Sequence, residues 1–211
     1  MLPMRQYLYT VQATRPGMLY QPTSEEGHIA GEHIAYLRSL TQAGVGIFGG
    51  ALKLRDSRHM GLFVFQVESD EEARSIVEQD PAVKNRIMRA CLFPFRIALW
   101  NEAAFILDDT QQHFLYHIQA VRPEQVQAPT QWEQEKTTEH FYYLKDQTEK
   151  GVFGIVGRTQ NEDYSTFGWG IMRTTSEQEA WKIAENDPAV IQRVMRLDVL
   201  PFGVAMFTSL E

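Results

Sequence analysis

The sequence has little cysteine and no long apolar run. Cys91 is the only cysteine among 211 residues, so no internal disulfide can form. No stretch approaches the roughly 18 apolar residues of a membrane-spanning helix, and the N-terminus lacks the continuous apolar segment of a secretory signal. A disulfide-stapled secreted domain and a helical membrane protein are therefore disfavoured. We expect a cytoplasmic protein with no membrane partner.

Clustered positive charge is also missing. The net charge is −7 and no Lys/Arg block occurs, so we expect no nucleic-acid partner, because phosphate binding needs a basic face. No His/Cys spacing matches a zinc site, and Gly49-Gly50 lies outside the strand-to-helix context of a nucleotide loop. We therefore predict no metal and no cofactor. With 44% hydrophobic and 22% charged residues, the chain has an ordinary globular composition.

The most informative feature of the sequence is an internal repeat. The stretch "TEHFYYLKDQTEKG" resembles "GEHIAYLRSLTQAG", and the shared histidines give the offset 140 − 33 = 107. The same offset, without gaps, aligns most of the chain with roughly a third of the pairs identical. This period is too long for a solenoid unit and matches one small domain. We predict two repeats, 1–106 and 107–211.

Each repeat shows the same order of expected elements. Aromatic and β-branched residues predict strands at 5–15, 45–54, 59–67 and 89–99, and helical spacing predicts helices before Gly44 and after Ser69. The order strand, helix, strand, strand, helix, strand is that of ferredoxin-like domains. The predicted fold class is therefore α+β, with two ferredoxin-like (βαββαβ) repeats packed as an intramolecular dimeric α+β barrel.

Polar residues gather at one end of each predicted repeat. If the first strand runs up, Arg15 at its end, His33 early in the helix and Asp56 in the following turn share that end. Arg122, His140 and Asp163 repeat the set. A carboxylate beside an imidazole fixes its tautomer and suits general acid or base chemistry near neutral pH. The arginines would favour a small anionic substrate.

Structural roles are open for the same residues. A lone histidine on a helix is often a satisfied core residue, and the Arg-Pro pairs can simply end a strand. Asp80 and Asp187 each precede a proline, where an aspartate most simply caps or turns the backbone. The other histidines have no histidine at the equivalent position and are interpreted as incidental; they are His28, His59, His113 and His117.

The helix motifs, the Asp-x-x-x-x-Gly turns, "DEEARSIVEQDPAV" and the closing "FPF" or "LPF" resemble those of the YciI-like (YCII-related) family, a branch of the dimeric α+β barrel superfamily. The resemblance implies a ferredoxin-like domain and an acid–base dyad, His33 with Asp56 and His140 with Asp163. We also expect the strand-end glycines, Gly50 and Gly157, to contribute to substrate binding together with Arg15, Arg122 and Arg158. The family often has proline after this glycine. Here Ala51 and Arg158 follow, so Arg158 could make the second pocket unlike the first.

Three functional hypotheses follow. The leading one is a cofactor-independent enzyme that isomerises, eliminates from or hydrolyses a small, anionic metabolite with a His-Asp dyad. The alternative is a non-catalytic module that binds a small-molecule ligand or another protein. A third reading, taken from more distant relatives, is a barrel that binds haem or acts as a monooxygenase. The expected assembly is a monomeric pseudo-dimer or a homo-oligomer.

Overall fold

The computed structural model of the chain describes residues 4–54 and 56–209. They form two compact units: unit 1 comprises residues up to Phe95 together with those from Gly203 onward, and unit 2 comprises Arg96–Phe202. This division differs from the repeat boundary expected at 106–107, because the last strand of each repeat begins in one unit and ends in the other. The repeat boundary itself stays a prediction.

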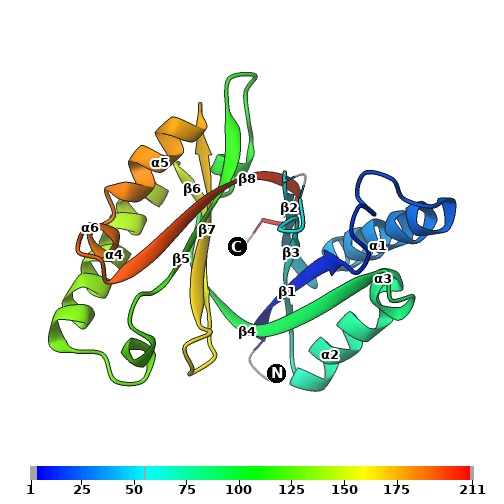
Figure 1. Cartoon of the computed structure of the whole chain (residues 1–211), viewed down its shortest axis with the longest axis horizontal. Coiled ribbons are helices and arrows are strands. Elements are labelled where there is room, and N and C mark those ends of the chain that lie inside the picture. Colours follow the sequence, from blue (N-terminus) through cyan, green and yellow to red (C-terminus); the bar gives the residue numbers. More distant parts are fainter. Residues whose placement is uncertain (1–3, 55, 210–211) are drawn as a thin grey trace. The chain divides into compact units, whose positions relative to one another are not determined.

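Unit 1 contains an antiparallel sheet in the order β4–β1–β3–β2, because β1 pairs with both β3 and β4, and β2 pairs with β3. Its helices lie on one side of this sheet (Figure 1). This is the expected ferredoxin-like arrangement, with one short additional helix after the second helix of the repeat. In chain order the elements are β1 (Arg5–Ala13), α1 (Ser24–Gln42), β2 (Gly46–Leu52), β3 (Gly61–Val67), α2 (Asp70–Gln79), α3 (Pro81–Lys84) and β4 (Met88–Trp100).

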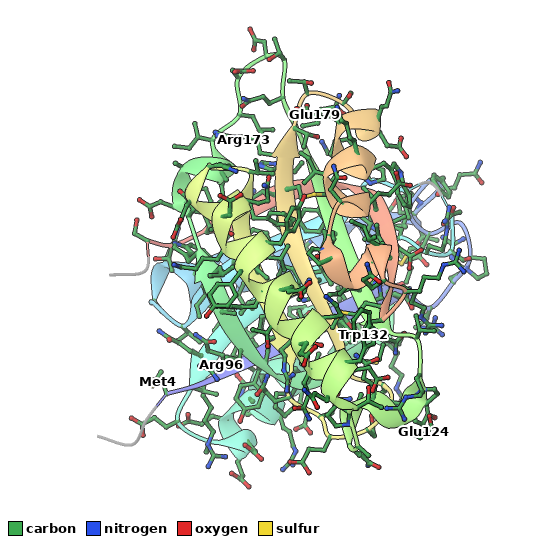
Figure 2. The ribbon with its side chains drawn as sticks, turned by 90° about the vertical axis from the view of Figure 1, so that its left-hand side faces the viewer. Met4, Arg96, Glu124, Trp132, Arg173 and Glu179 are labelled. Atoms are coloured by element: carbon green, nitrogen blue, oxygen red, sulfur yellow. The ribbon has the colours of Figure 1, made fainter. Side chains whose placement is uncertain are left out.

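Unit 2 repeats this arrangement in the order β8–β5–β7–β6. Figure 2 views unit 2 from its helical side: Trp132 and Glu124 lie at the end where α4 begins, and Arg173 and Glu179 lie at the other. In chain order the elements are η1 (Glu102–Phe105), β5 (Gln112–Ala120), η2 (Pro123–Val126), α4 (Gln131–Glu149), β6 (Phe153–Thr159), β7 (Phe167–Thr174), α5 (Glu177–Glu185), α6 (Pro188–Ile191) and β8 (Met195–Phe207).

The first α-helix of each unit, α1 in unit 1 and α4 in unit 2, begins with a side-chain cap at the same place in the repeat. Thr23 accepts a hydrogen bond from the backbone N–H of Glu26, whose carboxylate accepts one from the Thr23 N–H, and α4 begins with the same reciprocal capping box. Gly44 and Gly151 follow the helix ends with φ of +76°. Only glycine adopts this left-handed conformation without steric cost, which confirms the two predicted helix ends.

Helix α1 buries a different stripe from the one that its sequence suggests. Helical spacing favours a stripe through Ala30, Ile34, Leu37 and Thr41, whereas α1 buries Ile29, His33 and Leu37. Ile34 is 38% exposed, so the expected stripe is rotated by about one residue. This rotation turns His33 toward the sheet and away from solvent.

The last strand of each repeat runs through its proline. A proline inside a strand predicts an interrupted strand, at an edge or a bulge, but β4 is continuous from Met88 to Trp100, with Pro94 opposite Tyr7 of β1.

Within residues 4–54 and 56–209, none of the helices combines the length and apolarity required to cross a membrane.

Candidate active site

A buried histidine and a buried aspartate meet between α1 and α3. Nδ1 of His33 lies 2.7 Å from Oδ2 and 2.9 Å from Oδ1 of Asp80. His33 is 4% exposed and Asp80 is fully buried. Because a carboxylate can only accept, the imidazole donates its Nδ1–H to Asp80. The contact therefore sets the tautomer and the orientation of the ring.

Two further donors hold the Asp80 carboxylate. The Tyr9 hydroxyl donates to Oδ2 at 2.9 Å, and the backbone N–H of Ala82 donates to Oδ1 at 2.8 Å. The Ala82 contact is the N-cap of α3, because Asp80 directly precedes Pro81 at the first position of that helix. A buried carboxylate is tolerated when its oxygens are paired in this way. Burial, and then the Asp80 charge, raise the pKa of Tyr9, so its hydroxyl remains a donor.

Unit 2 contains the same constellation. Nδ1 of His140 lies 2.6 Å from Oδ2 of Asp187, and the Tyr116 hydroxyl donates to the same oxygen at 2.6 Å. The Ala189 N–H caps α6 through Oδ1 at 2.9 Å. Burial raises the pKa of Tyr116 well above its usual value, and the Asp187 charge adds to the effect. Both copies of the repeat have thus kept the same histidine, aspartate and tyrosine.

Each histidine lines a cavity. In unit 1 the cavity has a volume of about 890 Å³, and its walls include Tyr9, His33 and the strand-end Gly50. In unit 2 it has a volume of about 540 Å³ and is lined by Tyr116, His140 and Gly157. Since Nδ1 is held by the carboxylate, Nε2 is the ring nitrogen left for a ligand. A neutral imidazole in this tautomer can accept a proton at Nε2 and return it.

The sequence profile of the YCII-related domain matches residues 7–95 and 114–202, one match in each repeat. The chain belongs to the YCII-related domain family. The two matches cover most of the chain, and both contain the complete histidine, aspartate and tyrosine constellation of one YCII-related domain. No curated protein matches the sequence.

Solved structures resemble this YCII-related chain over nearly its whole length. They include a "putative monooxygenase" from Fusobacterium nucleatum subsp. nucleatum (8% identity, TM-score 0.59, covering 96% of this chain and 93% of that one). A chlorite dismutase from Candidatus Nitrospira defluvii in complex with imidazole has 11% identity, a TM-score of 0.56 and coverages of 97% and 92%. A heme-binding protein from Thermus thermophilus has 13% identity, a TM-score of 0.52 and coverages of 95% and 92%. At such identities the likeness shows the fold alone, which is the dimeric α+β barrel fold expected from the sequence.

The predicted aspartate partners of the histidines were wrong. Asp56 lies on the exposed turn between β2 and β3, where it binds the Arg58 guanidinium at 2.7 Å and the Arg58 N–H at 2.8 Å. Asp163 lies in the equivalent exposed turn of unit 2 and accepts from the Ser165 N–H at 2.9 Å. Both carboxylates stabilise their own turns, and local partners hold their pKa values below the usual range. The carboxylate at each histidine is instead the helix-capping aspartate 47 residues further along the chain.

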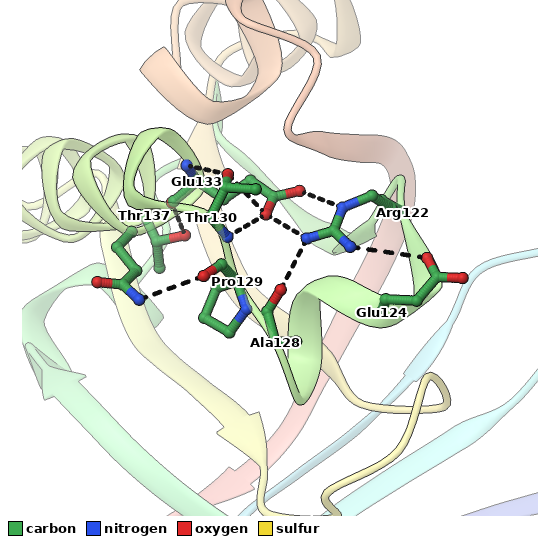
Figure 3. Close-up of polar contacts among 8 residues, drawn as sticks. Arg122, Glu124, Ala128, Pro129, Thr130, Glu133 and Thr137 are labelled. Atoms are coloured by element: carbon green, nitrogen blue, oxygen red, sulfur yellow. Dashed lines mark hydrogen bonds and ion pairs between the residues drawn. The ribbon is translucent and has the colours of Figure 1, made fainter.

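The predicted substrate arginines have a different role in the YCII-related domains. Arg122 binds Glu133 through two hydrogen bonds of 2.8 and 2.5 Å and donates to the Ala128 carbonyl at 2.9 Å (Figure 3). Arg15 makes the equivalent contacts with Glu26 and the Gln21 carbonyl. These guanidinium groups clamp the loop before the long helix and do not line the cavities, so the prediction that they bind substrate is not supported.

The remaining predicted residues do reach the cavities. Gly50 lines the cavity of unit 1, and Gly157 and Arg158 line that of unit 2. His59, interpreted as incidental, lines the cavity of unit 1 together with Lys53. The equivalent positions of the other repeat hold residues of a different type, so comparison of the two repeats could not identify His59 or Lys53 as cavity residues. Among the described residues, no group of three or more His, Cys, Asp or Glu could hold a metal ion.

Proposed function

We propose that the YCII-related domains of this chain catalyse proton transfer on a small organic acid, with His33 and His140 as the general acid/base. The observation that carries this proposal is the contact of a histidine with a fully buried aspartate at the wall of a cavity, which is present in both units. Asp80 and Asp187 are positioning residues, which hold Nδ1 and leave Nε2 for the substrate. This proposal replaces Asp56 and Asp163 in that role.

The cavity chemistry supports an acidic substrate. Lys53 and His59 line the cavity of unit 1, and Arg158 lines that of unit 2, while most other lining residues are apolar. A carboxylate bound by the cation would place the rest of the ligand in the apolar part of the cavity. A proton could then move between the substrate and Nε2 in an isomerisation or an elimination. Proton transfer of this kind needs no cofactor.

The test is a search for proton exchange. Small carboxylic acids with a C–H beside a carbonyl are incubated with the protein in D₂O, and deuterium incorporation is followed by NMR. We expect exchange with the native protein and its loss in the double variant His33→Ala, His140→Ala. The matched control is Asp56→Asn, Asp163→Asn, which alters carboxylates outside the cavities. Exchange that persists undiminished in the double histidine variant would remove the proposal.

A non-catalytic binding module is the second candidate, and one observation favours it. Asp80 caps α3 and accepts from Tyr9 as well as from His33, which is also what a structural anchor requires. Under this reading, ligands bind in the cavities without turnover. Ligand binding by the native protein together with no exchange across the acid panel would favour it.

Haem is a question raised by the similar structures, since one of them is described as heme-binding. His33 Nε2 is chemically able to ligate iron, because a ligating histidine commonly donates its other N–H to a carboxylate. Our proposal does not require this. Titration with haem tests it: a Soret band that His33→Ala abolishes would replace the acid–base proposal with a haem site.

A further inference from the structure

The cavities of the two units differ at equivalent positions. At several positions the residue lining the cavity of unit 2 is larger than its counterpart in unit 1. They are Thr137 for Ala30, Phe141 for Ile34, Val156 for Gly49, Arg158 for Ala51 and Trp169 for Leu62. These larger side chains go with the smaller cavity of unit 2, about 540 Å³ against about 890 Å³ in unit 1.

Gln125 places a buried amide at the cavity of unit 2. Its side chain is among the cavity walls, the residue is only 7% exposed, and Oε1 has no hydrogen-bond partner within residues 4–54 and 56–209. The equivalent residue in unit 1 is Met18, which is apolar and 3% exposed. A buried amide oxygen without a partner is unfavourable, and a turn of the side chain toward the cavity would let a ligand hydroxyl satisfy it. A hydroxyl can serve either amide atom, because it both donates and accepts.

The loop that carries Gln125 is held firmly. Gln125 belongs to η2, and the clamp of Arg122 on Glu133 and the Ala128 carbonyl fixes both ends of this segment (Figure 3). The Gln127 amide also donates to the Glu162 carbonyl at 3.0 Å, which ties the segment to the turn between β6 and β7. The amide is therefore presented to the cavity by a rigid support, as a specificity determinant requires.

Arg158 supplies a cation to the same cavity. It lies near the end of β6, and among the described residues its guanidinium has no carboxylate partner. Trp169 of β7 is 2% exposed and gives the cavity an aromatic wall. A cation, an amide acceptor and an indole ring together match a flat ligand that carries a carboxylate and a hydroxyl.

We propose that the two units bind different ligands, and that the cavity of unit 2 selects a compact aromatic hydroxy acid. Arg158 binds its carboxylate, Gln125 its hydroxyl and Trp169 its ring. Unit 1 has Ala51 and Met18 at the first two positions, and its larger cavity, with Lys53 and His59 in its wall, accepts a bulkier acid without that hydroxyl. The inference rests on the proposed function in placing the ligand beside His140, but it concerns binding and is tested without turnover.

Isothermal titration calorimetry with salicylate and benzoate provides the test, because the two probes differ by one hydroxyl. We expect one salicylate bound per chain, and weaker binding of benzoate. Arg158→Ala, which installs the residue of unit 1, should weaken both probes about tenfold or more, as loss of a charged contact implies. Gln125→Met should weaken salicylate about three- to tenfold and leave benzoate unchanged.

Lys53→Ala is the matched control, because it removes the lysine of the unit 1 cavity and should leave salicylate binding unchanged. Arg158→Gln, at an exposed strand end, repeats the charge test without disturbing the core. Absence of salicylate binding, an unaltered affinity in both Arg158 variants, or equal effects of Gln125→Met on the two probes would each overturn the inference. Salicylate binding without any proton exchange in the acid panel would overturn the proposed catalysis and leave this inference standing.

Discussion

The ring of Phe63 lies so close to Gly46 that a Cβ at Gly46 would be 2.5 Å from Phe63 Cζ. In unit 2 the two partners are exchanged. Phe153 stands at the position of Gly46 and Gly170 at that of Phe63, and a Cβ at Gly170 would lie 2.8 Å from Phe153 Cδ1. Each unit therefore fills the space between its second and third strands with one ring and one glycine, supplied by opposite strands.

Gly46→Ala should destabilise unit 1. The new methyl group would also lie 2.6 Å from Thr41 Oγ1, so the strand or its neighbours must shift. Overpacking of this kind costs about 1–3 kcal/mol. We expect the free energy of unfolding, measured by urea denaturation, to fall by this amount. The double variant Gly46→Phe, Phe63→Gly copies the arrangement of unit 2 and should be more stable than Gly46→Phe alone.

Gly31→Ala is the control for this experiment. Gly31 lies within α1, and no atom lies within 4 Å of the Cβ that alanine would add. Replacing a glycine inside a helix by alanine stabilises by roughly 0.5–1 kcal/mol. If Gly46→Ala were as harmless as Gly31→Ala, the close packing of the Phe63 ring would be contradicted.

Asp80→Ala should be among the most destabilising single substitutions in unit 1. It removes the acceptor of His33, Tyr9 and the Ala82 N–H at once, and each buried donor left without a partner costs about 1–3 kcal/mol. Asp80→Asn should cost less, because an amide oxygen can still cap α3. The measurement is again denaturant unfolding of the purified variants.

Asp56→Asn separates the dyad seen in the structure from the one expected from the sequence. Asp56 is exposed and contacts only its own turn, so we expect a change within about 0.5 kcal/mol. The ¹⁵N shifts of the His33 imidazole give a second readout. They should report protonated Nδ1 in the native protein and in Asp56→Asn, and an altered tautomer balance in Asp80→Asn. The reverse pattern would restore Asp56 as the partner.

Much of the fold could be predicted because its signals are local. Gly44 and Gly151 end the helices with positive φ, and the alternation of aromatic residues marks the strands. The internal repeat strengthened both signals, because each predicted helix and strand occurs once in each repeat. The exchange of Phe63 and Gly46 could not be predicted, since neither position keeps its residue type in the other repeat.

The site was harder to predict because its central contact joins distant segments. Both Asp56 and Asp80 recur in the second repeat, so retention alone could not choose between them. Topology placed Asp56 at the same end as His33, whereas the short helix α3, which was not predicted, brings Asp80 beneath α1. Asp80 was correctly interpreted as a cap. A cap and an imidazole partner use different oxygens and lone pairs of one carboxylate, so one role does not exclude the other.

Glu133 should make stability depend on pH in the acid range. Arg122 and the cap of α4 hold its folded pKa at about 2, below its ordinary value of 4.5. The unfolded chain therefore binds this proton first, and the stabilisation that is complete above about pH 5 is lost as the pH falls toward 2. Glu133→Gln should be less stable than the native protein at pH 7, with a smaller difference near pH 2.

Glu78→Gln is the matched control, because Glu78 is exposed on α2. It should follow the native protein at every pH. Urea unfolding between pH 7 and pH 2 measures the three curves. A difference between the native protein and Glu133→Gln that stays constant across this range would contradict the clamp as the cause.

Tyr9 and Tyr116 should make stability fall at alkaline pH. Burial raises both pKa values above the usual value near 10, so the unfolded chain releases these protons first and the native state loses stability as the pH rises above about 10. The variant Tyr9→Phe, Tyr116→Phe should show a flatter alkaline slope, whereas Tyr164→Phe, with its ring 72% exposed, should retain the native slope. Unfolding measured from pH 7 to 11 gives all three slopes. Identical slopes in the two variants would mean that these hydroxyls do not stay protonated as donors to Asp80 and Asp187, and the histidines would then lose the fixed carboxylate on which their proposed role depends.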